Sequence, residues 1–183
     1  MFYTKKGDDG KTQVFGCDQR LSKSSAVAEA LGVLDEGNSF LGICKIKLFK
    51  EDIDVFGEKE SLLIEEIQNN LFTIQAQIAS VDKKVLYKEV EKIENLIIKI
   101  ETVIPPVKSF IVSGSCEISA LFDFARALIR TAERRVVAVS EEGLVKIDEN
   151  SLKYLNRLSS FLFALARHNA YKSGINEGSP IYK

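Results

Sequence analysis

The stretch Ala125-Arg-Ala-Leu-Ile-Arg-Thr-Ala-Glu-Arg-Arg135 decides the fold, because its apolar and its charged residues both recur at the spacing of an α-helix. The pattern extends over about residues 118–139. Its apolar face comprises Leu121, Ala125, Leu128, Ala132, Val136 and Val139. The charged residues Arg126, Arg130, Glu133 and Arg134 fall within an arc of about 100°, roughly opposite that face. A helix of this kind buries one face against other helices, so the stretch predicts a helical bundle.

Four more segments have the same periodicity, and they predict helices over about residues 24–49, 58–79, 86–103 and 151–169. Ser24-Ser25 is a plausible start for the first of these helices, and Pro105-Pro106 ends the third. The short apolar run 110–115 is predicted to be an extended connection. No segment alternates as a strand would. The expected fold is therefore all-α, a five-helix antiparallel bundle with short loops.

The composition is that of an ordinary globular protein, with 183 residues, 45% of them apolar and 28% charged. We expect one domain, with residues 1–23 as an N-terminal loop, 24–170 as the bundle and 171–183 as a C-terminal tail. The net charge of −1 gives no indication of nucleic acid or an anionic membrane as a partner. No apolar run reaches the roughly 20 residues of a membrane span, and the N-terminus turns polar too early for a signal peptide. The scattered Cys17, Cys44 and Cys116 are read as reduced thiols in a cytoplasmic protein.

Two distant segments could serve one phosphate-containing ligand. The planar guanidinium groups of the arginine arc suit phosphate or carboxylate recognition, although such a stripe is often only a solvated helix face. The loop Tyr3-Thr-Lys-Lys-Gly-Asp-Asp-Gly-Lys-Thr-Gln13 lacks the glycine that a Walker A motif requires at its fifth position. It could still hold phosphates through backbone amides and Lys5, Lys6 and Lys11, or it could be a basic disordered terminus.

The remaining polar residues give weaker signals. Gly32, Gly37 and Gly42 lie inside the first predicted helix and indicate a close approach by a ligand or, equally, by a packed helix. Asp35 and Glu36 are neighbours in sequence and point about 100° apart, so they are not an acid–base pair. The single histidine, His168, is expected at the surface or in a capping role near the end of the last helix. Neither a catalytic triad nor a cluster of metal ligands is evident.

Taken together, five ordered motifs resemble the ATP:cob(I)alamin adenosyltransferases of the trimeric PduO type over nearly the whole chain. The motifs run from Thr4 to Thr12, from Leu34 to Gly42, from Phe110 to Ser115, from Ala125 to Arg134 and from Leu155 to Phe163, with Lys23 following the first. The chain departs from the family pattern at Gly37, Ser113, Ser115, Phe122, Thr131, Ser160 and Phe161, mostly on the corrinoid side or beside the phosphate-binding arginines.

The resemblance implies a ferritin-like five-helix homotrimer in which Co(I) of a reduced corrinoid attacks C5′ of ATP, held with Mg²⁺, to give adenosylcobalamin and triphosphate. It implies a nucleotide site made of Thr4, Lys5, Lys6, Gly7, Thr12, Gln13 and Lys23, completed from a neighbouring chain by Arg130, Glu133, Arg134 and Asn156. Arg126 would pair with Asp35 across the interface, and Phe110 would form an apolar wall under the corrin ring. A reductase and a cobalamin-dependent acceptor enzyme would be further partners. The alternatives are a weakly active relative that serves as an ATP or corrinoid sensor or carrier, and a purely structural bundle.

Overall fold

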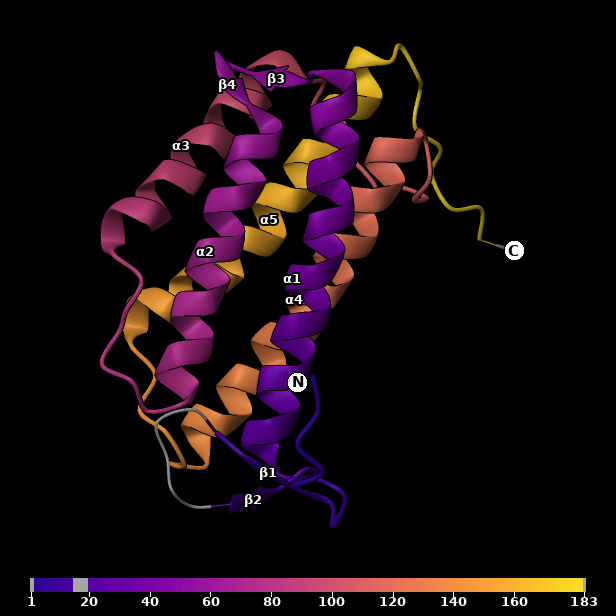
Figure 1. Ribbon diagram of the computed structural model, residues 1–183. Helices are drawn as coiled ribbons and strands as arrows, with labels where there is room; N and C mark the ends of the chain where they lie inside the picture. Colours follow the sequence, from indigo (N-terminus) through magenta and orange to yellow (C-terminus); the bar gives the residue numbers. More distant parts are fainter. Residues whose placement is uncertain (1, 15–19, 183) are drawn as a thin grey trace.

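The computed structural model describes residues 2–14 and 20–182, and within them it has five long helices. Successive helices run in opposite directions (Figure 1). Their bounds are α1 Ala26–Glu51, α2 Glu60–Ile78, α3 Tyr87–Val103, α4 Glu117–Glu141 and α5 Glu149–Lys172. Each of the five predicted helices is therefore present, with ends that differ from the predicted ones by at most three residues. The fold is the expected antiparallel bundle.

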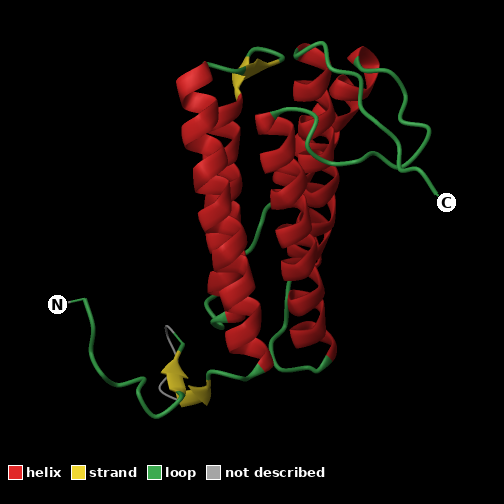
Figure 2. Ribbon diagram, turned by 90° about the vertical axis from the view of Figure 1, so that its right-hand side faces the viewer, coloured by secondary structure: helices red, strands yellow, loops and turns green. Residues whose placement is uncertain are grey.

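Two small antiparallel hairpins lie at opposite ends of the bundle (Figures 1 and 2). One pairs β1 Lys11–Gln13 with β2 Arg20–Ser22, before α1. The other pairs β3 Asp54–Val55 with β4 Glu58–Lys59, between α1 and α2. The sequence prediction of loop alone over residues 1–23, with no strand anywhere, was wrong in this respect. Strands of two or three residues are too short to produce a recognisable alternation.

Local signals explain where the long helices begin and end. The Ser25 side chain accepts a hydrogen bond from the Ala28 amide at 3.3 Å and so caps the start of α1, as predicted. At the other end, Asp52 takes a left-handed conformation that stops the helix. A Cβ atom on Gly37 would lie 3.1 Å from Cδ1 of Ile129 in α4. This glycine therefore allows α1 and α4 to approach closely. Of the two explanations offered for it, a ligand or a packed helix, the structure favours the packed helix.

The buried face of α4 is rotated from the predicted one. Phe122, Ala125, Ile129, Ala132 and Val136 are fully buried, whereas Leu121 and Leu128 are only half-buried. The reason is that α4 packs against both α1 and α5, so its apolar arc is wide and the sequence pattern does not locate the centre. Arg126 and Glu133 consequently lie at the flank of this face, half-exposed, and not opposite it.

The prediction of a surface position for His168 was also wrong. His168 is buried, stacks on Phe56 and places Nδ1 3.7 Å from the carboxylate of Glu60. Glu60 is itself fully buried and accepts two hydrogen bonds, at 3.1 and 3.3 Å, from the Asn169 amide. The β3–β4 hairpin brings Glu60 over the end of α5, a tertiary contact that no helical periodicity reveals. Within the described part of the chain, no helix is both long enough and apolar enough to cross a membrane.

Candidate functional site

A cavity of about 800 Å³ opens between the end of α3, the connection 104–116, α4 and α5. One part of its wall is apolar and comes mainly from the connection and α5, including Pro105, Pro106, Phe110, Ile111 and Phe163. The other part is charged and comes from Asp123, Arg126, Arg130 and Arg167. A wide apolar surface next to a few fixed charged groups suits a large ligand that has both a flat apolar body and polar substituents.

Phe110 lies on the rim of this cavity with 79% of its surface exposed. The connection that carries it follows Pro105-Pro106 and, as predicted, has neither helix nor strand. The C-terminal tail runs beside this connection (Figure 2) and holds it. The Val112 amide donates to the Gly178 carbonyl at 2.9 Å, and the hydroxyls of Ser109 and Ser179 are 2.7 Å apart.

Arg167 forms the buried polar floor of the cavity. Its guanidinium donates to Oδ2 of Asp123 at 2.7 Å, and its Nε lies 3.1 Å from the carboxylate of Glu177 in the tail. The ring of Phe163 lies beneath two guanidinium groups, with the carbon of Arg167 4.8 Å and that of Arg126 5.6 Å from its centroid. Arg167 thus joins α4, α5 and the tail at one point.

The polar residues predicted on α4 and α5 form a second group beside the cavity. The amide of Asn156 donates to Glu133 at 2.9 Å, and its oxygen accepts from Arg157 at 2.7 Å. Arg130 and Arg134 are exposed on the adjoining face of α4. Arg134 donates to the hydroxyl of Thr131 at 3.1 Å. Glu133 and Asn156 are therefore oriented by each other, and Arg130 presents its guanidinium to both the cavity and the solvent.

The predicted nucleotide loop has a defined path in the described residues. The ammonium group of Lys23 donates to the Gly7 carbonyl at 2.8 Å, and the Lys6 amide contacts the Thr4 hydroxyl at 3.4 Å. Lys5 has a φ of 60°, which is unusual for a residue other than glycine. Thr12 and Gln13 belong to β1. The loop is therefore folded back on the start of α1 through Lys23.

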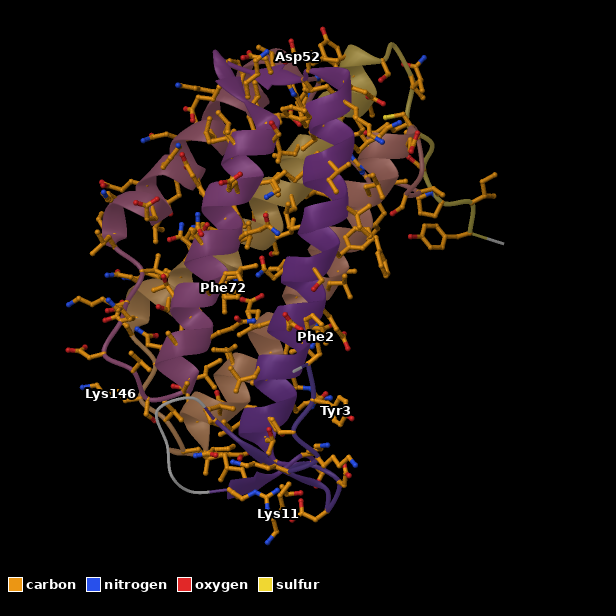
Figure 3. All side chains as sticks on the ribbon, viewed as in Figure 1. Phe2, Tyr3, Lys11, Asp52, Phe72 and Lys146 are labelled. Carbon is orange, nitrogen blue, oxygen red and sulfur yellow. The ribbon has the colours of Figure 1, made fainter. Side chains whose placement is uncertain are left out.

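One chain does not bring all the predicted residues together. The cavity gathers Phe110, Arg126 and Arg130. The nucleotide loop lies at the end of the bundle where α1 begins, with Tyr3 and Lys11 there (Figure 3). In residues 2–14 and 20–182, no hydrogen bond or ion pair joins Thr4–Gly7 or Lys23 to Arg130 or Asn156. Asp35 is exposed on α1.

Sequence reasoning missed Asp123 and Arg167 at the cavity, and Glu177, which pairs with Arg167 from the tail. An arginine is ordinarily exposed, yet only 3% of Arg167 is accessible to solvent. The sequence offers only a weak signal, an arginine four residues after Phe163 in an otherwise apolar turn. Its two acidic partners come from 44 residues earlier in the chain and from the tail, so the pairing depends on the tertiary fold.

Comparisons with known proteins agree with this arrangement. A family model described as cobalamin adenosyltransferase matches residues 2–169. A corrinoid adenosyltransferase of Bacillus subtilis is 38% identical over 179 residues, which are 96% of this chain and 89% of the relative. The corrinoid adenosyltransferases PduO of Salmonella typhimurium and Citrobacter freundii are 36% and 37% identical over 90% and 94% of this chain. The chain spans only 48% and 52% of those two proteins, about half their length.

A solved structure gives the same result for the fold. A variant of the PduO-type ATP:corrinoid adenosyltransferase from Lactobacillus reuteri, complexed with cobalamin and ATP, superposes with a TM-score of 0.84. It is 30% identical in sequence, and the match covers 97% of each chain. The family match over most of the chain, these relatives and this shared fold establish that the chain belongs to the cobalamin adenosyltransferase family.

Proposed function

We propose that this protein transfers the 5′-deoxyadenosyl group of ATP to the cobalt of a reduced corrinoid and releases triphosphate. The observation that carries the proposal is the cavity, which the exposed Phe110 and the guanidinium groups of α4 line together in a chain of this family. The relative from Lactobacillus reuteri, complexed with both cobalamin and ATP, supports the same pair of substrates.

The nucleotide would be held by residues of two kinds. The N-terminal loop offers lysine side chains and backbone amides to the phosphates, from Thr4, Lys5, Lys6, Gly7, Thr12, Gln13 and Lys23. The bundle offers Arg130 and Arg134 as charge-assisted donors, and the Glu133–Asn156 pair as a fixed polar surface for the nucleoside. Mg²⁺ would accompany the phosphates of ATP.

A second copy of the chain would complete each site. In the described residues no hydrogen bond or ion pair joins the segment Thr4–Gly7 or Lys23 to Arg130 or Asn156, so a neighbouring chain is a simple way to bring both groups to one ligand. We propose a homotrimer with the sites at its interfaces. Asp35, exposed on α1, would pair with Arg126 of a neighbouring copy.

The reaction requires the protein mainly to position its two substrates. Co(I) is a strong nucleophile, so displacement at C5′ of ATP needs no general base, and the leaving triphosphate needs cationic groups such as Arg130. Phe110 would lie as an apolar wall against the lower face of the corrin ring. By excluding water and the lower axial ligand, it would make Co(II) easier to reduce to Co(I).

The test is turnover of chemically reduced cobalamin with ATP and Mg²⁺, followed by the absorbance change from Co(I) to alkyl-Co(III) and by the release of triphosphate. Turnover supports the proposal. Thermal stabilisation by ATP or corrinoid without turnover supports the sensor or carrier alternative. A ligand at 100 times its Kd adds about 2.7 kcal/mol of stability, so a protein that neither turns over nor is stabilised is a structural bundle.

A further inference from the structure

Arg20 and Asp9 form a clasp across the nucleotide loop. The guanidinium of Arg20 in β2 donates to both carboxylate oxygens of Asp9, at 2.9 and 2.8 Å. The same group donates to the carbonyls of Lys6 and, at 3.4 Å, Lys11, so it spans the loop from one side to the other. Paired N–H groups meeting paired oxygens fix the orientation of both side chains as well as their distance.

The clasp also helps to fix the backbone conformation of the loop. The carbonyl of Lys6 is bound by Arg20, and that of the next residue, Gly7, is bound by Lys23 at 2.8 Å. The preceding residue, Lys5, has the positive φ of 60°. A conformation of this kind persists where the surrounding contacts hold it in place. Two cations on successive carbonyls supply such contacts, and they act on the segment that is proposed to meet the phosphates.

The charge balance of the loop depends on the same pair. Lys5, Lys6 and Lys11 attract a polyphosphate, whereas a free carboxylate at residue 9 would repel it. The hydrogen bonds from Arg20 and from the Lys11 amide, at 3.1 Å, hold the pKa of Asp9 below its usual value, so this carboxylate is charged at neutral pH. Arg20 neutralises it. The arginine therefore has its partner within the loop and is engaged before any ligand arrives.

We propose that Arg20 and Asp9 are positioning residues for ATP, which shape the N-terminal loop without themselves contacting the phosphates, Arg20 also cancelling the negative charge of Asp9. This inference rests on the proposed function, because it concerns the nucleotide half of the same site. It predicts that damage to the clasp raises the KM for ATP and leaves kcat and the KM for corrinoid unchanged.

The experiment compares Arg20→Ala, Asp9→Asn and the double variant with the wild-type protein. Arg20→Ala removes the donor and leaves an uncompensated carboxylate, so the KM for ATP should rise about fivefold or more. Asp9→Asn alone should raise the KM for ATP less, because the side-chain oxygen of asparagine can still accept a hydrogen bond from the Lys11 amide. The double variant should have a lower KM than Arg20→Ala, because the repelling charge is gone. If Arg20 instead bound phosphate directly, Asp9→Asn would free it and lower the KM, which would overturn the proposal.

The controls separate this inference from the proposed function and from folding. Lys153→Ala breaks another exposed ion pair, with Glu149 at 2.6 Å on α5, and should leave every parameter unchanged. Circular dichroism and melting temperature should match the wild type in all variants, since the clasp lies outside the bundle core. If the wild-type protein has no turnover, the proposed function fails. The clasp is then tested by thermal stabilisation, where the ATP concentration needed for half of the full effect should rank the variants in the order predicted for the KM. Equal ATP dependence in wild type and Arg20→Ala, by either readout, contradicts the clasp.

Discussion

Arg167 and Asp123 form a buried ion pair, 2.7 Å long, between α5 and α4 at the floor of the cavity. The two side chains are 3% and 7% exposed, and Glu177 of the tail adds a second carboxylate at 3.1 Å from the arginine. Removal of one member of such a pair leaves a charge without its partner in a poorly solvated position. The pair therefore holds α5 against α4, and the same arginine holds the tail through Glu177.

Asp123→Ala should lower the free energy of unfolding by about 3 kcal/mol or more, because Arg167 loses its most buried partner. Glu177→Gln should cost far less, since Asp123 remains and the tail carboxylate is more exposed. The measurement is urea unfolding followed by circular dichroism. Equal losses in the two variants would contradict this prediction and show that the two carboxylates balance the arginine charge to the same extent.

Phe110→Ala should leave stability within about 0.5 kcal/mol of the wild type, because 79% of the side chain is already exposed. Its effect should instead appear in the reaction. An assay that begins from Co(II) with a reductant should show a much larger defect than one that begins from prepared Co(I), because the wall acts on the reduction step. Equal defects in the two assays, or a loss of 3–5 kcal/mol typical of a buried phenylalanine, would assign Phe110 a structural role.

The helical fold could be predicted from the periodic apolar residues. The features that could not be predicted depend on contacts between segments distant in sequence. Every helix was predictable because stripes such as Leu63 to Ile78 and Val90 to Ile100 follow one spacing over several turns. The resemblance placed Phe110, Arg126 and Arg130, which do line one cavity. In contrast, the burial of Arg167 and His168 depends on carboxylates from distant segments, and the rotation of α4 depends on two packing partners. Such pairings have no periodic signature in a single sequence.

Arg130→Ala should lower kcat/KM for ATP about 10- to 100-fold while leaving the unfolding free energy nearly unchanged. The side chain is exposed, and a charge-assisted hydrogen bond contributes about 1.5–3 kcal/mol. A matched control is Arg135→Ala on the same helix, where the arginine lies 3.5 Å from Glu29 at the surface and has no proposed role. Similar kinetics for the two variants would remove Arg130 from the nucleotide site.

Cys44 should resist alkylation in the folded protein at pH 8. Burial raises the pKa of its thiol to about 12, so the reactive thiolate is a very small fraction at that pH and grows only as the pH approaches this value. Cys116 is partly exposed and should react first. Cys17, the third cysteine of the sequence, lies outside the described residues. Mass spectrometry of peptides after brief iodoacetamide treatment is the measurement, with a denatured sample as control. Rapid labelling of Cys44 in the native protein would mean that α1 opens readily.

Two impaired variants should partly restore each other's activity if each site is shared between chains. Lys23→Ala damages the nucleotide loop, and Arg130→Ala damages the arginine face. In a homotrimer with interfacial sites, random mixing of the two leaves about a quarter of the sites with both halves intact. Co-expressed variants should therefore regain about a quarter of the wild-type activity, and light scattering should give three times the mass of one chain. A monomer at micromolar concentration, or a mixture no more active than the mean of its two components, would show that each chain carries its own complete site.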